Sequence, residues 1–110
     1  MAFKAPCVAA STGNLTLSGE QTINGVAVVA DDRVLVKDQS TASSNGIYVA
    51  DTGSWVRAID FDGNYDIKKG SLVYVTGGTS VGKGIWTVTS SNPIVVDTDS
   101  INFTSVLLTT

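Results

Sequence analysis

The feature that most constrains the fold is a pair of β-prone runs joined by a polar loop. The first run is residues 32–37, DRVLVK, and the second is residues 46–49, GIYV. The eight residues 38–45 between them are small or polar, and Asn45-Gly46 is a dipeptide typical of tight turns. Because Val, Ile and Tyr favour strands, the pattern predicts an antiparallel hairpin.

A similar pattern recurs about 38 positions further along the chain. Residues 72–75, LVYV, match the first run, residues 76–83 form a second eight-residue loop, and residues 84–86, GIW, match residues 46–48, GIY. Residues 55–59, WVRAI, alternate along the chain and are expected to add a third strand to the first unit. The sequence therefore predicts an all-β fold, a small sandwich or open barrel built from two similar β-meanders.

The rest of the chain carries no helical pattern. No window of 11 or more residues places apolar residues at helical spacing without an intervening Gly or turn cluster. We expect one β domain over residues 15–110, preceded by an extended arm over residues 1–14 that packs on a neighbouring subunit or frays. The core is expected to draw on the apolar and aromatic residues of the strand runs: Val34, Val36, Ile47, Val49, Trp55, Leu72, Tyr74, Ile85, Trp86 and Phe103.

Composition argues against several classes of function. The 110 residues carry a net charge of −3, so no basic patch for nucleic acid is expected. The apolar runs are too short to span a bilayer, and the N-terminus lacks the long apolar segment of a secretion signal. The chain has no histidine and no nucleophile motif, so we expect no catalytic residue, no cofactor and no enzymatic activity. The single cysteine, Cys7, is expected to be a small buried side chain.

One stretch imitates a phosphate-binding loop. Residues 77–83, GGTSVGK, satisfy the Gly-x4-Gly-Lys half of that motif, but Gly84 stands where Mg²⁺ requires a Ser or Thr. A phosphate loop also needs a helix N-terminus at this point, whereas residues 85–88 continue as a strand pattern. We interpret the stretch as a glycine-rich hairpin loop.

A second stretch alternates oxygen-bearing side chains. Four residues have the spacing of the first half of a calcium loop: Asp60, Asp62, Asn64 and Asp66. Gly63 lies at the wrong step for that loop, and Ser71 stands where the bidentate Glu is required. Turn formation accounts for these Asp and Asn residues without an ion, so we expect no essential metal and keep the four only as weak calcium candidates.

Aromatic residues and loops supply the remaining binding candidates. Five aromatic side chains offer a platform for a sugar, although their positions within strands favour core packing: Tyr48, Trp55, Tyr74, Trp86 and Phe103. The two eight-residue loops are expected to be exposed and tolerant of insertion. Their candidate exposed residues are Gln39, Ser40, Thr41, Ser43, Ser44, Gly78, Thr79 and Ser80.

Several short motifs follow one another in a fixed order. They are residues 15–19 (LTLSG), 21–26 (QTINGV), 32–37 (DRVLVK), 45–49 (NGIYV), 55–58 (WVRA) and 60–62 (DFD). Together they resemble the β-rich repeat module of tail fibres and other structural proteins of tailed bacteriophages, and the resemblance covers roughly residues 8–106. The family usually has Gly-Asp where this chain has Asp31-Asp32, a change that the fold tolerates because Asp adopts left-handed backbone readily.

The resemblance implies a structural role in the phage particle and no enzymatic activity. The module normally lies inside a longer fibre polypeptide, so a chain with one copy is expected to be a small accessory or decoration subunit on the capsid or tail surface. Such a protein is located in the virion after synthesis in the host cytoplasm. The expected partners are other virion proteins and further copies of this chain, which is expected to form a trimer. The alternatives are a tail-fibre-type module that binds a glycan of the host surface, and a monomeric cytoplasmic protein with an unknown ligand.

Overall fold

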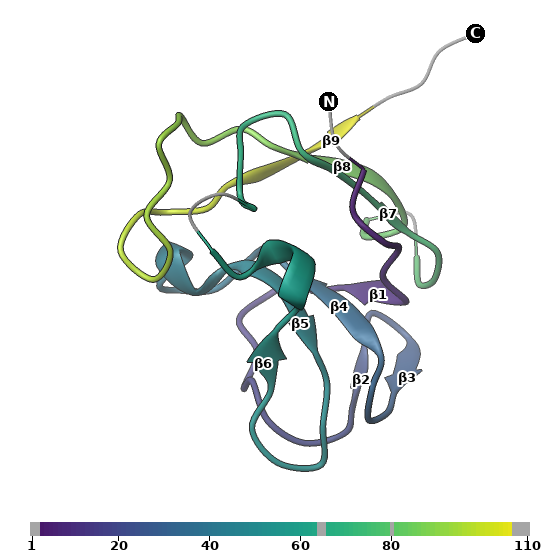
Figure 1. Ribbon diagram of the computed structural model, residues 1–110. Helices are drawn as coiled ribbons and strands as arrows, with labels where there is room; N and C mark the ends of the chain where they lie inside the picture. The colour runs from purple at the N-terminus through teal and green to yellow at the C-terminus, as the bar shows by residue number, and fades with distance from the viewer. Residues whose placement is uncertain (1–2, 64–65, 80, 107–110) are drawn as a thin grey trace, which may run out of the picture.

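The computed structural model describes residues 3–63, 66–79 and 81–106. Strands make up 35% of these described residues and helical turns 6%, so the predicted all-β class is confirmed. Within the described residues the strands form three sheets (Figure 1). The elements are β1 (Ala9–Ala10), β2 (Gln21–Ile23), β3 (Val26–Val28), β4 (Arg33–Val36), η1 (Ala42–Ser44), β5 (Gly46–Val49), β6 (Val56–Arg57), η2 (Ile59–Phe61), β7 (Leu72–Val75), β8 (Gly84–Val88) and β9 (Phe103–Val106).

The predicted first hairpin is confirmed as β4 and β5, at the centre of a sheet ordered β1-β4-β5-β6. Leu35 lies opposite Ile47, and Val36 lies opposite Gly46. Gly46 has a φ of +153°, and a Cβ at this position would collide with the guanidinium of Arg57. The first residue of the return strand therefore has to be glycine.

The third strand of this unit is shorter than the sequence predicts. The expected strand covers residues 55–59, whereas β6 contains only Val56–Arg57. Ile59 begins the 3-10 turn η2, in which Asp60 forms an ion pair with Arg33 of β4. This tertiary contact, which sequence periodicity does not reveal, lies where the strand ends.

The second predicted hairpin is confirmed as β7 and β8, and β9 joins them in a sheet ordered β7-β8-β9. Val75 lies opposite Gly84, just as Val36 lies opposite Gly46 in the first hairpin. In Figure 1 this sheet forms a separate layer over the central strands, and the β2–β3 hairpin lies on their other side.

The N-terminal segment links the two larger sheets. Phe3 and Cys7 form parallel bridges to Leu72 and Val75 of β7, and β1 pairs in parallel with β4. The Cys7 backbone donates to Tyr74 O at 2.9 Å, while Val8 N donates to Arg33 O at 2.9 Å. Residues 3–11 of the expected arm are thus extended, and these backbone bonds are to strands of their own chain.

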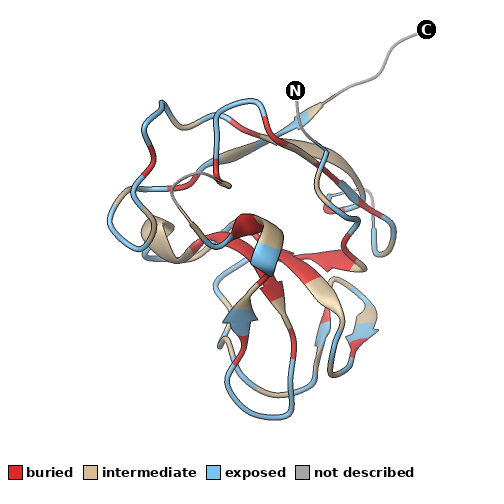
Figure 2. Cartoon of the chain, in the orientation of Figure 1, coloured by how far each residue is buried: buried red, intermediate tan, exposed pale blue. Residues whose placement is uncertain are grey.

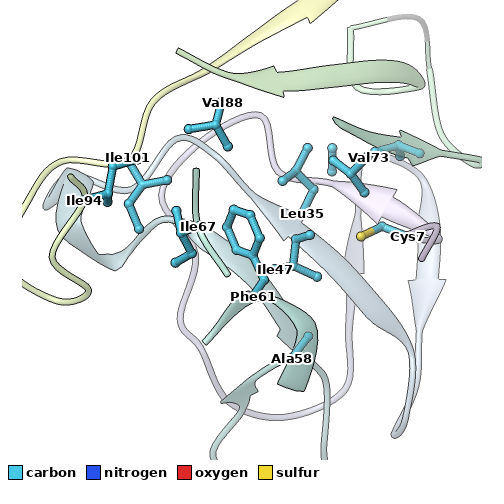
Figure 3. Close-up of a cluster of buried hydrophobic side chains, with 12 residues drawn as sticks. Cys7, Leu35, Ile47, Ala58, Phe61, Ile67, Val73, Val88, Ile94 and Ile101 are labelled. Carbon is cyan, nitrogen blue, oxygen red and sulfur yellow. The ribbon is translucent and has the colours of Figure 1, made fainter. Parts of the chain in front are cut away.

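Two hydrophobic clusters cover the two faces of the central sheet. Figure 2 marks the buried residues along the ribbon, and Figure 3 shows the cluster that contains Leu35, Ile47 and Phe61. Leu35 and Ile47 point into the cluster shared with the β7-β8-β9 sheet, which also contains Phe61. Val34 and Val36 point into the opposite cluster, which the β2–β3 hairpin and Trp55 complete. Both faces of β4 are therefore buried, which explains its uninterrupted apolar run.

The predicted core is correct for some residues and wrong for Tyr74, which is 43% exposed. In β7 the buried side chains are Val73 and Val75, and Leu72 is half-buried on the same side as Tyr74. A four-residue apolar strand does not show which of its faces is buried, because alternate residues are equally apolar. Of the other expected core residues, Val34, Val36, Ile47 and Trp55 are buried, whereas Val49, Ile85, Trp86 and Phe103 are half-buried.

Candidate functional site

Asp60, the first of the weak calcium candidates, is already paired. Arg33 Nη1 donates to Asp60 Oδ1 at 2.9 Å, and Nη2 donates to Oδ2 at 3.1 Å. Ala5 N also donates to Oδ2 at 3.3 Å, and Arg33 Nη2 donates to Ala5 O at 2.9 Å. Burial by itself would raise the pKa of Asp60, but the hydrogen bonds and charge of Arg33 outweigh it and lower that pKa. Both Asp60 oxygens therefore serve to hold the N-terminal segment, β4 and η2 together.

Of the other calcium candidates, the described Asp62 and Asp66 do not join Asp60 in a group that could hold a metal ion. Asp62 is exposed and Asp66 half-buried on the loop after η2, and Asn64 lies outside the described residues. Across the part of the chain that the structure describes, no three Asp, Glu, Cys or His side chains come together as a metal would require. The expectation that no metal is essential stays a prediction.

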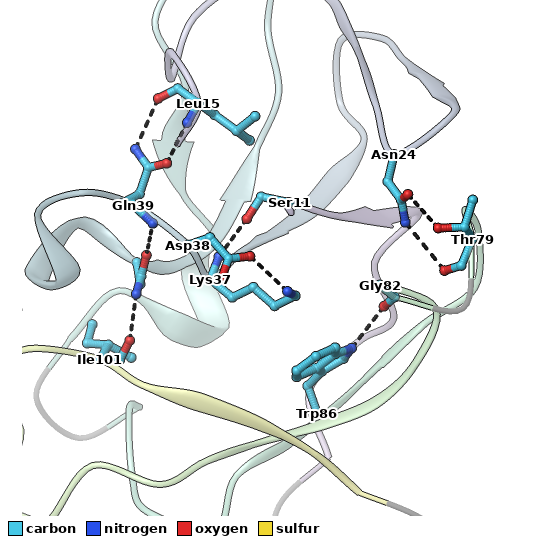
Figure 4. Close-up of polar contacts among 11 residues, drawn as sticks. Ser11, Leu15, Asn24, Lys37, Asp38, Gln39, Thr79, Gly82, Trp86 and Ile101 are labelled. Carbon is cyan, nitrogen blue, oxygen red and sulfur yellow. Dashed lines mark hydrogen bonds and ion pairs between the residues drawn. The ribbon is translucent and has the colours of Figure 1, made fainter. Parts of the chain in front are cut away.

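Loop 38–45 is more firmly held than the sequence suggests. Gln39 donates to Leu15 O at 3.0 Å and accepts from Leu15 N at 2.7 Å (Figure 4). Asn45, only 3% exposed, accepts from Gln39 N and donates to Ile101 O, both at 2.9 Å. Of the expected exposed residues, Ser40 and Thr41 are exposed, whereas Gln39, Ser43 and Ser44 are half-buried. Sequence analysis missed Asn45 as an anchor because its partners come from distant segments.

Loop 76–83 is confirmed as a hairpin loop, since β8 follows it directly. A Cβ on Gly77 would come within 2.5 Å of Val8 O, and one on Gly78 within 2.7 Å of Asn24 Nδ2. Thr79 Oγ1 donates to Asn24 Oδ1 at 2.7 Å (Figure 4). The glycines thus allow close packing against the N-terminal segment and the β2–β3 turn. Gly78 and Thr79 are exposed, and Ser80 lies outside the described residues.

The five aromatic candidates do not form a common platform. Tyr48 and Trp55 are each 6% exposed, and Phe103 packs against Phe61 with ring centroids 6.0 Å apart. Burial raises the pKa of Tyr48, whose hydroxyl donates to Ser44 O at 2.6 Å. Trp86 is half-buried, with Lys37 Nζ 4.4 Å from its ring centroid. Tyr74 is the exposed one of the five.

The thiol of Cys7 is buried and is not expected to react at neutral pH. Its side chain is 1% exposed, and burial raises the pKa of the thiol to about 12, although the charge of Arg33 acts in the opposite direction. A thiol with so high a pKa is a poor nucleophile at neutral pH. The expectation of a small buried side chain is confirmed for Cys7.

The feature that sequence analysis missed is the outer face of the β7-β8-β9 sheet, the side turned away from the core. Cross-strand register places six residues on this outer face: Leu72, Tyr74, Ile85, Thr87, Thr104 and Val106. Phe3, which bridges to Leu72 and is 62% exposed, extends it. None of these seven residues is charged, although the chain as a whole carries a net charge of −3. The sequence shows that alternate residues of these strands lie on opposite faces of the sheet, but it does not show which face points away from the core.

One open groove of about 230 Å³ lies beside the β2–β3 hairpin, lined by Glu20, Gln21, Thr22, Ala27, Val28 and Val29 and by no aromatic residue. Among the described residues, none belongs to a helix with the length and hydropathy needed to cross a bilayer.

The comparisons with known proteins are negative: no family model, no curated protein and no solved structure matches this chain.

Proposed function

We propose that this protein is a structural subunit of a tailed-bacteriophage particle, located on the capsid or tail surface and bound by non-covalent contacts in many copies. The observation that carries the proposal is the outer face, which exposes Phe3 and Tyr74 and contains no charged residue. A contiguous uncharged apolar face on a small protein is typical of a surface that contacts other proteins. The ordered motifs of residues 15–62 supply the link to phage structural proteins.

The architecture proposed with this function is a small sandwich or open barrel of two similar β-meanders. The first meander is β4-β5-β6 and the second is β7-β8-β9, with corresponding valine–glycine pairs at the two hairpins. The N-terminal segment supports this arrangement, because its backbone bonds to both β7 and β4. In either arrangement the outer face, which exposes Phe3 and Tyr74, is available to partners.

The alternative, a module that binds a host glycan, has less support. A sugar platform needs aromatic rings that share one exposed surface. Tyr48 and Trp55 are buried in the cluster between the central sheet and the β2–β3 hairpin, whereas Tyr74 lies on the outer face of the other sheet. Protein contacts therefore account better for the exposed residues than a sugar does.

The proposal is tested by quantifying the protein in gradient-purified particles of the phage that encodes it. We expect a fixed copy number well above one per particle. Tyr74→Lys should reduce incorporation because it places a charge on the outer face, whereas the control Val29→Lys, at a residue 50% exposed beside the β2–β3 hairpin, should not. A protein that stays in the soluble lysate and is missing from particles contradicts the proposal. Normal incorporation of the Tyr74 variant would show that the particle is contacted elsewhere.

The expected anchoring role of the N-terminal arm needs a milder test than deletion. Cys7, Ala9, Ala10 and Ser11 are buried at 1% exposure or less, so removing the arm would damage the fold itself. Phe3→Lys alters only an exposed side chain of the same segment. Reduced incorporation of this variant with an unchanged melting temperature would support anchoring, and unchanged incorporation would contradict it. The trimer expected from the sequence stays a prediction.

A further inference from the structure

Strand β9 leaves one edge of its sheet open. Within the described residues, β9 pairs with β8 and with no strand on its other side. Thr89 N donates to Asn102 O at 2.9 Å, which fixes the pattern of this antiparallel ladder. Residues 102, 104 and 106 bond toward β8, so the N–H and C=O groups of Phe103 and Ser105 point away from the sheet. Two donors and two acceptors are thus presented along this edge.

This edge lacks the features with which proteins prevent unwanted strand pairing. Charged residues, prolines and bulges commonly protect exposed edges. Residues 100–106, SINFTSV, contain no charge, no proline and no glycine. By contrast, the N-terminal segment covers the opposite edge at β7, and the central sheet ends at the two-residue strand β6. The open edge of β9 is therefore better suited to accept another strand than the edges at β7 and β6.

We propose that β9 pairs antiparallel with β9 of a second copy, about a two-fold axis that passes between the two Thr104 residues. Phe103 then lies opposite Ser105 of the second copy, and Ser105 opposite its Phe103. Both are hydrogen-bonded pairs, so the four edge groups of each copy are satisfied by about four interchain hydrogen bonds. The product is a continuous sheet ordered β7-β8-β9-β9-β8-β7.

The side chains favour a second copy of this chain as the occupant. In this register the large Phe103 faces the small Ser105 on one side of the sheet, and Thr104 faces Thr104 on the other. Cross-strand threonine pairs are favourable, and the strand brings no like charges together. The uncharged outer faces of the two copies also become one surface, with Tyr74, Ile85 and Val106 of each copy in line across the strands. An isologous contact of this kind gives a dimer and does not by itself produce a trimer.

Disulfide trapping tests the register directly. The two Thr104 residues would form a non-hydrogen-bonded pair with Cα atoms about 4.5 Å apart, within the range of a disulfide. In a Cys7→Ala background, Thr104→Cys should yield a disulfide-linked dimer under mild oxidation, seen on a non-reducing gel. The matched control is Thr87→Cys, because Thr87 is the β8 partner of Thr104 on the same face and would lie about 14 Å from its counterpart. The control should not cross-link. Equal cross-linking of both variants, or of neither, overturns the proposal.

A variant with an added charge tests the same contact without a cross-linking reaction. The unmodified protein should sediment at twice its 11.4 kDa chain mass at micromolar concentration. Thr104→Lys places two ammonium groups opposite each other and should weaken the dimer about tenfold or more, whereas Thr87→Lys separates them by more than a Debye length of about 8 Å. Far-UV circular dichroism checks that both variants fold. A monomeric wild-type protein, or equal weakening by both variants, overturns the proposal. These measurements use purified protein, so they are independent of whether the protein enters particles.

Discussion

Arg33 and Asp60 form a bidentate ion pair, with Nη1–Oδ1 and Nη2–Oδ2 distances of 2.9 and 3.1 Å. The pair joins β4 to η2, and both side chains also bind the backbone of Ala5 in the N-terminal segment. Three segments far apart in the sequence therefore meet at one carboxylate. This carboxylate was the first of the calcium candidates. Its bonds to Arg33 and Ala5 account for an aspartate at this position without a bound ion.

We expect Asp60→Asn to lower the free energy of unfolding by about 1–2 kcal/mol at pH 7, since a partly exposed but bidentate pair is lost. The pKa of Asp60 is lowered in the folded protein, so the carboxylate stabilises the fold above the unfolded pKa of about 4 and loses this effect as the pH falls through the lower folded value. The difference between wild type and variant should thus be constant above about pH 5 and shrink below about pH 4. Urea denaturation at several pH values measures this difference in the free energy of unfolding. The exposed Asp62, changed to Asn, is the control, and a difference that grows on acidification would contradict the assignment.

Chelation should leave the protein unchanged. Because Asp60 is engaged by Arg33, removal of divalent ions with EDTA is expected to shift the melting temperature by less than about one degree. Differential scanning fluorimetry with and without added calcium provides the measurement. A strong rise in melting temperature with calcium, abolished by Asp60→Ala together with Asp62→Ala, would mean that the loop binds the ion after all.

The aromatic residues should differ sharply in their contribution to stability. Phe61→Ala and Trp55→Ala are each expected to cost about 3–5 kcal/mol, because these side chains are 1% and 6% exposed. Trp86→Ala should cost about half as much, since that ring is half-buried. Tyr74→Ala should cost less than about 1 kcal/mol. Equilibrium unfolding of the four variants checks the ranking, and a large loss for Tyr74→Ala would place its ring in a core.

The Cys7 thiol should react only when the protein unfolds. Its burial and a pKa of about 12 leave neither access nor thiolate at neutral pH. A disulfide exchange reagent such as DTNB at pH 8 is expected to label the native protein at least about a hundredfold more slowly than the urea-unfolded protein. Rapid stoichiometric labelling under native conditions would show that the N-terminal segment opens readily.

Local sequence determined the hairpins. The β-branched runs of residues 32–37 and 72–75, each followed by a polar loop and a Gly-Ile pair, predicted β4-β5 and β7-β8. The reason is that strand propensity and turn preference depend on neighbouring residues, so a short stretch of sequence is enough to predict them. The same holds for the glycine-rich loop 76–83, which lacks the helix that a phosphate site requires.

Tertiary structure alone decided which strand faces are buried and which partners the polar residues bind. Leu72 and Tyr74 alternate with Val73 and Val75, and only the packing of β7 over the central sheet turns the valines inward. Asn45 donates a hydrogen bond to Ile101, 56 residues away in the sequence. Asp60 is paired with Arg33, which lies 27 residues earlier. Contacts over such separations depend on how sheets stack, and a sequence pattern of period two is the same for either face. The open edge of β9 follows from the strand order, which the sequence of the strand does not specify.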